Sequence, residues 1–184
     1  MLNNLKNVFK NSLRVALALF TLISILVVSS CGGIEYDMVE CNAGNFKYSI
    51  PDYYVLYEHS EADAYYVTVN SEIAVYSYTR DEFDAVFPDY VGDYSAVDVA
   101  EYIIERNNYQ CQVKYEGSRD SATYNLLYHT ESGAQYYYMN SLLSNESNIA
   151  MLSFSCPVDR ADGYDALIRS IVDSMGFKDD FIIE

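Results

Sequence analysis

The sequence predicts an α+β domain in which a mostly antiparallel sheet of seven or eight strands is flanked by two or three helices. Most segments between Phe46 and Pro157 are rich in Tyr, Val and Ile and alternate between apolar and polar residues. This pattern is typical of strands with one buried face. Three other segments instead show helix-capping residues followed by apolar residues at helical spacing. Short turns separate successive strands, which favours an antiparallel arrangement.

The predicted strands form two sets along the chain. The first set contains the segments FKYSI, YYVLYE, AYYVTVN and EIAVYSYT, which we interpret as strands connected by hairpins. The second set contains YQCQVKYE, SATYNLLYH, AQYYYMNSLL and IAMLSFSC. In YQCQVKYE, strand alternation places four side chains on one face, those of Tyr109, Cys111, Val113 and Tyr115.

Three helices are predicted from capping signals. Thr79 and Ser95 each begin a segment of capping-box form, with an acidic residue three positions later. The third helix is the longest, and Asp159 or Asp162 is its expected N-terminal cap. Its apolar stripe continues to Gly176, a residue type that commonly ends helices.

Residues 1–30 have the features of a signal peptide. The first fourteen residues carry three basic residues and no acidic one, and Val15–Val28 is apolar apart from Thr21 and Ser24. A basic start followed by an apolar run is typical of a secretory signal. The run is shorter than the roughly 20 residues that span a bilayer as a helix. An uncleaved N-terminal anchor is the alternative interpretation.

The segment Val28-Ser29-Ser30-Cys31 resembles the bacterial lipobox, which consists of an aliphatic residue, two small residues and a cysteine. The resemblance implies that Cys31 carries a diacylglycerol thioether and becomes the mature N-terminus. Two or more acyl chains, each CH₂ contributing about 0.8 kcal/mol, would anchor the protein to the lipid bilayer. Residues 31–45 would then form the lipidated N-terminus and a short tether. The alternative is that Cys31 follows an ordinary cleavage site by chance.

The chain after the tether is predicted to form a single domain over residues 46–178, with an acidic tail at 179–184. Without residues 1–30, the chain has 8 Lys and Arg against 27 Asp and Glu, a net charge of −19. Such a charge repels nucleic acid, and we exclude nucleic-acid binding. A solvated acidic surface is the simplest interpretation, and attraction of cations or basic partners is the alternative.

Three further cysteines follow Cys31: Cys41, Cys111 and Cys156. Outside the cytoplasm one disulfide could form among them, and we consider Cys111 with Cys156 as the pair. Both lie in the apolar phase of predicted strands, so buried free thiols are an equally open alternative. No Cys and His spacing typical of zinc occurs.

Two segments resemble PsbP-like domains. FKYSIPDYY at residues 46–54 is similar to their opening strand, and SFSCPVDRADGYDALIRSIVDSM at residues 153–175 is similar to their closing strand and helix. The resemblance spans residues 44–178. It implies an antiparallel sheet flanked by helices, in a family that includes many bacterial lipoproteins and whose members act as binding or assembly modules. It assigns no role to an individual residue.

No catalytic signature is present. The chain has no G-x-S-x-G, P-loop, HExxH or GxGxxG motif, and its two histidines are His59 and His129. We therefore predict no enzyme activity, no catalytic residue and no cofactor. Because both histidines lie near carboxylates, a hydrolase-like enzyme that uses either one is the less favoured alternative.

Two acidic stretches raise the possibility of calcium binding. Their members are Asp81, Glu82, Asp84 and Asp89 in the first stretch, and Asp159, Asp162 and Asp165 in the second. Neither has the D-x-D-x-D-G order of a calcium loop. We predict no metal site and keep a calcium-binding surface sensor as an alternative.

Tyrosine is the most unusual feature of the composition, because all 20 tyrosines follow Cys31 and tryptophan is absent. Tyrosine provides a large contact area and a hydroxyl for binding surfaces, although it is also a strong strand former. We interpret the chain as a membrane-anchored lipoprotein on the extracytoplasmic face of the cell membrane. It would act as a non-catalytic binding or envelope-assembly module for an unknown protein or small molecule.

Overall fold

The computed structural model describes residues 37–115, 120–130 and 132–178. These described residues all belong to one compact unit. The predicted signal peptide, the predicted lipid-attachment residue Cys31 and the predicted acidic tail lie outside the described residues. In the described part of the chain, no helix is both long and apolar enough to cross a membrane.

Seven strands form the larger sheet, and all neighbouring strands in it are antiparallel. Their order is β3-β4-β5-β9-β8-β7-β6. The bounds are Val55–Tyr57 for β3, Ala64–Val67 for β4, Glu72–Thr79 for β5, Lys114–Tyr115 for β6, Ser121–His129 for β7, Gln135–Ser144 for β8 and Asn148–Pro157 for β9. The expected α+β class and antiparallel sheet are confirmed.

A second antiparallel sheet has three strands in the order β1-β2-β10. The bounds are Met38–Ala43 for β1, Phe46–Pro51 for β2 and Gly176–Phe177 for β10. Strand β1 occupies part of the predicted tether at 31–45. Its side chains are mostly exposed or half-buried, so the strand lacks the alternation by which sequence reveals a buried face. Gly44, at φ +56°, allows the tight turn that pairs β1 with β2.

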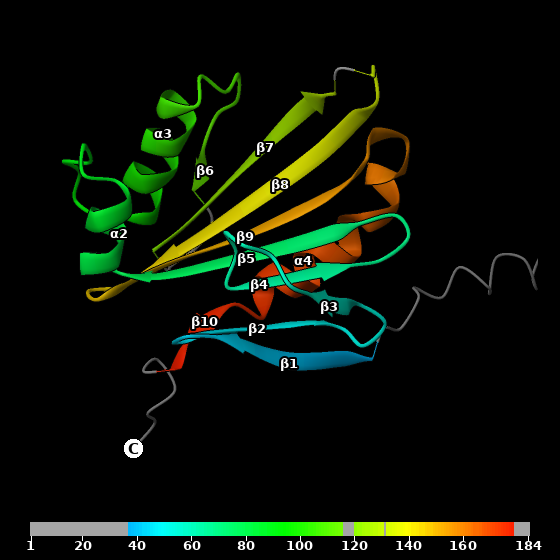
Figure 1. Ribbon diagram of the computed structural model, residues 1–184, viewed down its shortest axis with the longest axis horizontal. Helices are drawn as coiled ribbons and strands as arrows, with labels where there is room; N and C mark the ends of the chain where they lie inside the picture. The colour runs from blue at the N-terminus through cyan, green and yellow to red at the C-terminus, as the bar shows by residue number, and fades with distance from the viewer. Residues whose placement is uncertain (1–36, 116–119, 131, 179–184) are drawn as a thin grey trace, which may run out of the picture. The chain divides into compact units, whose positions relative to one another are not determined.

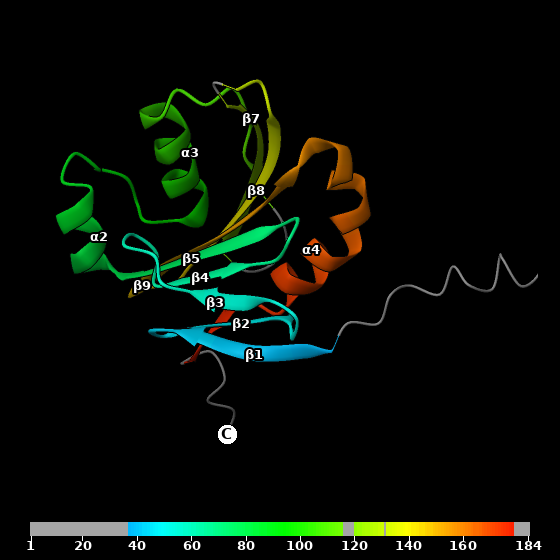
Figure 2. The ribbon, with the colours of Figure 1, turned by 45° about the vertical axis from the view of Figure 1, so that its right-hand side comes forward.

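Helices α2 and α3 cover one face of the larger sheet, whereas α4 and the three-stranded sheet lie on the other side (Figures 1 and 2). The bounds are Arg80–Val86 for α2, Ala96–Arg106 for α3, Val158–Tyr164 for the 3₁₀ helix η1 and Asp165–Asp173 for α4. At α2, the predicted capping box is present, with the Thr79 side chain accepting from Glu82 N and the Glu82 side chain accepting from Thr79 N.

Two local predictions were wrong. Neither η1 nor α4 has a side-chain cap, so Asp159 and Asp162 do not cap the last helix. The chain first turns through η1 after Pro157, and α4 begins only at Asp165. The predicted strand YQCQVKYE is reduced to Lys114–Tyr115. Its first half instead follows α3 as irregular chain, where Cys111 and Val113 pack against the core beside that helix.

Candidate ligand-binding cleft

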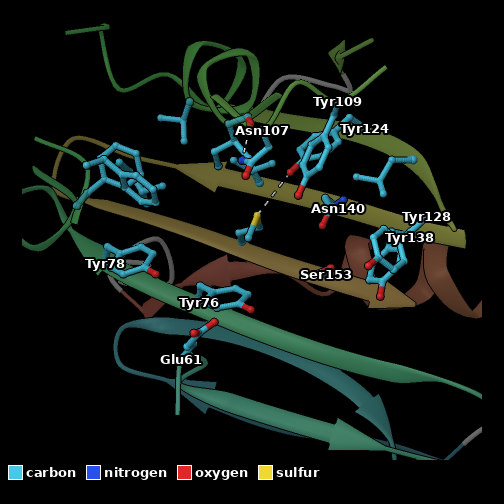
Figure 3. Close-up of a pocket in the computed structure, with 18 residues that line it drawn as sticks. Glu61, Tyr76, Tyr78, Asn107, Tyr109, Tyr124, Tyr128, Tyr138, Asn140 and Ser153 are labelled. Carbon is cyan, nitrogen blue, oxygen red and sulfur yellow. Dashed lines mark hydrogen bonds between the residues drawn. The ribbon is translucent and has the colours of Figure 1, made fainter. Parts of the chain in front are cut away.

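A cleft of about 550 Å³ opens between the seven-stranded sheet and the helices α2 and α3 (Figure 3). Its volume lies within the range of about 300–1,000 Å³ that is typical of small-molecule sites. Most of its lining is aromatic or aliphatic. The lining residues are Glu61, Tyr76, Tyr78, Phe83, Phe87, Val99, Ile103, Asn107, Tyr109, Tyr124, Leu126, Tyr128, Tyr138, Asn140, Leu142, Ile149, Met151 and Ser153.

The register of the strands explains why these side chains converge. Residues directly opposite each other in an antiparallel pair point to the same face of the sheet. Tyr124 on β7 is opposite Asn140 on β8, and Asn140 is opposite Ser153 on β9. Ser153 is in turn opposite Ala74 on β5. The short side chain of Ser153 leaves space above the sheet, and Ser153 and Asn140 form the floor of the cleft.

Aromatic side chains lie on either side of this central row. Tyr78 meets Phe83 of α2 and Phe87, which follows α2, edge to face, with ring centroids 6.1 and 6.5 Å apart. In the other direction along the strands, Tyr128 meets Tyr138 edge to face at 6.3 Å. Figure 3 shows Tyr78 and the pair of Tyr128 and Tyr138 at opposite ends of the floor, with Asn140 and Ser153 between them. The cleft therefore has two aromatic ends and a polar centre.

Three phenols of the cleft, those of Tyr76, Tyr124 and Tyr138, have raised pKa values and remain protonated at neutral pH. Burial raises the pKa of Tyr76, and the carboxylates of Glu61 and Asp63 raise it further because they disfavour a nearby phenolate. Burial likewise raises the pKa of Tyr124. It also raises the pKa of Tyr138, where the Glu72 carboxylate adds to the effect. Each of these hydroxyls can therefore donate or accept a hydrogen bond but is not a nucleophile.

Asn140 is the central polar residue of the cleft. The residue is only 5% exposed and its side chain belongs to the lining. Among the described residues, the buried side-chain nitrogen or oxygen without a hydrogen-bond partner is Arg80 Nε, so the Asn140 amide is not a sealed, unpaired group. A polar group within a mostly apolar lining can fix the orientation of a bound molecule. Neighbouring Tyr124 makes only a weak contact, from its hydroxyl to Met151 Sδ at 4.0 Å.

Charge in the cleft is confined to one side. Glu61 is the only acidic or basic side chain among the described lining residues. It lies next to Tyr76 at the edge that precedes β4, as Figure 3 shows. The cleft thus combines an aromatic lining, a central amide and a single carboxylate.

The structure does not bring the two histidines together. His59 lies in the turn before β4, where its Nδ1 accepts from the amides of Glu61 and Ala62 at 3.2 Å each. His129 ends β7, and strands β5, β9 and β8 separate β7 from β4. Neither histidine lines the cleft. The arrangement therefore offers no acid-base pair for the hydrolase-like alternative.

The first acidic stretch is engaged in local hydrogen bonds. Glu82 completes the cap of α2, and its pKa is lowered by the hydrogen bonds that it accepts from Thr79. Asp84 accepts from the Tyr94 hydroxyl at 2.6 Å. Asp89 accepts from Tyr102 and Arg106, at 2.8 and 2.7 Å. Among the described residues, no group of three or more His, Cys, Asp or Glu side chains could hold a metal ion.

Cys41, Cys111 and Cys156 are free thiols in the structure. The predicted pair of Cys111 with Cys156 does not form, because the two residues lie on opposite faces of the seven-stranded sheet. Cys156 shares a face of β9 with Phe154, which contacts Tyr164 of η1. Cys111 instead packs on the side of α3. A disulfide requires Cα atoms within about 7 Å, which the intervening sheet does not allow.

No protein-family model and no curated protein matches the sequence, but solved structures match the fold. Cyanobacterial PsbP (CyanoP) from Synechocystis sp. PCC 6803 has a TM-score of 0.51 at 13% identity, over 80% of this chain and 96% of that one. The Ran-binding protein Mog1p from Saccharomyces cerevisiae has a TM-score of 0.52 at 10% identity, over 82% of this chain and 100% of that one. LpqN, described as involved in cell envelope biogenesis of Mycobacterium tuberculosis, has a TM-score of 0.51 at 13% identity, over 77% of this chain and 90% of that one. The expected PsbP-like architecture is thus supported at the level of fold.

Sequence reasoning identified tyrosine as a candidate binding residue but missed the cleft and its polar residues. One signal for Asn140 was present. In the segment AQYYYMNSLL, it occupies the same strand phase as Tyr138 and Leu142, so a polar residue stands where an apolar one is expected. A polar residue in a buried phase predicts either a hydrogen-bonded core position or a site.

Proposed function

We propose that the protein is a non-catalytic binding protein and that the tyrosine-lined cleft is its ligand site. The observation that carries this proposal is the cleft of about 550 Å³, in which the polar side chains of Asn140 and Ser153 lie within an aromatic lining. Binding is favoured over catalysis because the cleft lining contains no His, Lys or Cys among the described residues. The buried phenols, whose pKa values are raised, cannot act as bases near neutral pH.

The same proposal places the protein on the extracytoplasmic face of the cell membrane, anchored by a lipid on Cys31. Its support is the lipobox-like segment Val28–Cys31 and the preceding apolar run. A fold shared with LpqN, a protein described as involved in cell envelope biogenesis, fits an envelope role. The cleft would then bind its ligand close to the membrane surface.

The cleft can be tested with the neutral dye Nile red, whose fluorescence rises in apolar pockets. We expect binding to residues 35–184 and its loss in Ser153→Trp, because the indole fills the hollow above the floor. Leu127→Trp is the matched control, since Leu127 is 61% exposed and points to the opposite face of β7. Thermal melts of both variants check folding. Equal dye binding by Ser153→Trp and the native protein would refute the cleft as the site.

The anchor can be tested separately in cells that express the full chain. Incorporation of an alkyne-labelled fatty acid should occur in the native protein and disappear in Cys31→Ala. The control is Cys41→Ala, which removes a thiol from the folded unit and should leave labelling unchanged. Labelling that persists without Cys31 would contradict the anchor and leave the proposal for the cleft untouched.

A further inference from the structure

The cleft also carries information about the charge of its ligand, and the following inference rests on the proposed function of the cleft. Three carboxylates lie at its β4–β5 side. Glu61 lines the cleft, Asp63 accepts a hydrogen bond from Ser77 N of β5 at 2.7 Å, and Glu72 is the first residue of β5. Their proximity also contributes to the raised pKa of Tyr76 and Tyr138. The electrostatic potential on this side is therefore negative.

Basic side chains near the cleft are directed elsewhere. Arg106 pairs with Asp89 at 2.7 Å, and Arg80 stacks over the Tyr94 ring at 4.9 Å. Neither arginine lines the cleft. Within the described part of the chain, no Lys or Arg forms an ion pair with Glu61. A carboxylate at the mouth of an aromatic pocket thus has no cation of its own.

The aromatic rings of the cleft add to the attraction that Glu61 exerts on a cation. The face of a ring carries partial negative charge and attracts a cation placed within about 6 Å. Tyr76 lies beside Glu61, and Tyr109 lies across the cleft from them (Figure 3). A carboxylate next to tyrosine rings is the combination that recognises organic ammonium groups. An anionic ligand would meet repulsion from the same groups.

We infer that the cleft binds a small organic cation, an ammonium or guanidinium group attached to an apolar body. The charged group lies between Glu61 and Tyr76. The apolar body fills the hollow above Ser153 and Met151, where the Asn140 amide hydrogen-bonds to a polar group of the ligand. The volume of about 550 Å³ suits a small molecule of this kind.

Three probes of nearly equal shape test this inference: tyramine, tyrosol and 4-hydroxyphenylacetate, which are cationic, neutral and anionic at pH 7. Calorimetric titration of residues 35–184 at low salt should give the tightest binding for tyramine. Its affinity should exceed that of tyrosol on the order of tenfold, the size of a combined carboxylate and cation–π attraction. The anion should bind most weakly.

Glu61→Gln should weaken tyramine binding several-fold and leave tyrosol binding unchanged. Glu58→Gln is the matched control, because Glu58 lies in the same turn but does not line the cleft. Equal affinities for tyramine and tyrosol, or binding of neither, would overturn the inference of a cation. Nile red binding that is sensitive to Ser153→Trp would then still support the cleft as a site. Failure of the cation inference can therefore be distinguished from failure of the cleft as the ligand site.

Discussion

The two faces of the seven-stranded sheet are covered in different ways, and β9 contributes to both. On one face Leu152 and Phe154 are fully buried beneath η1, α4 and the three-stranded sheet. On the other face Met151 and Ser153 are only half-buried, because α2 and α3 leave the cleft open. Alternate residues of one strand therefore serve the core and the candidate site. Substitutions of the fully buried residues on the first face should affect stability, and those of the half-buried residues around the cleft should affect binding. The cleft face also has its own buried core, which includes Leu142 and Ile149.

The largest expected effect is a loss of stability on the packed face. Phe154→Ala should lower the free energy of unfolding by about 3–5 kcal/mol, because it removes a fully buried ring. Leu126→Ala removes a half-buried side chain from the cleft and should cost less than about 2 kcal/mol. Urea denaturation measures both values. Similar losses would show that the two faces are packed alike.

Thiol reactivity should also distinguish the faces. Burial, with a smaller contribution from the Asp159 carboxylate, raises the pKa of Cys156 to about 11. In a Cys41→Ser background at pH 8, Cys111 should be alkylated at least roughly tenfold faster than Cys156. The buried Cys156 has a smaller fraction of thiolate and is less accessible to the reagent. Mass spectrometry of iodoacetamide-treated protein gives both rates. Faster labelling of Cys156 would contradict its assigned burial.

A smaller change is expected at the centre of the cleft. Asn140→Leu should change the free energy of unfolding by less than about 1 kcal/mol, because the amide lines the open cleft and is not part of a buried hydrogen-bond network. The matched control is Asn148→Leu. Asn148 is 4% exposed but donates to Asn145 Oδ1 at 3.3 Å, so its replacement should destabilise. If Asn140→Leu destabilises as much as Asn148→Leu, the amide contributes to folding and not to a site.

The smallest effect is the alkaline pH dependence of stability. The pKa of Cys156 is raised to about 11 in the folded protein, compared with about 8.5 for an unperturbed thiol. A raised pKa means that the folded state holds the proton more tightly, so this contribution is complete below about pH 8.5 and is lost toward pH 11. Melting temperatures measured from pH 7 to 10 should fall modestly, and less so in Cys156→Ala. An equal slope in both proteins would assign the loss to other groups.

Local features of the fold were predictable from the sequence. The capping box at Thr79 and the Ser95 side chain, which accepts from Asp98 N, are formed by residues three positions apart. Such signals do not depend on the rest of the structure. Strand β1 could not be predicted in this way, because it has few buried side chains and owes its structure to pairing with β2.

The cleft itself depends on contacts between distant parts of the sequence. Ser153 reaches the centre of the floor because β9 pairs with β5 on one side and with β8 on the other. The pairing of β5 with β9 cannot be read from alternation, which gives only the face of each strand. The tyrosines could therefore be identified as candidates, but not which of them share a pocket.

The pairing of β2 with β10 has a consequence for the order of folding. Phe46 pairs with Phe177, so the three-stranded sheet is complete only when almost the whole domain has been made. The pairing of β5 with β9 adds a second contact of long sequence separation. Folds with such contacts form slowly, because a long loop must close before the contact stabilises the chain. A slowly folding chain remains unfolded long enough to pass through a secretion channel, which the proposed export of this protein would require.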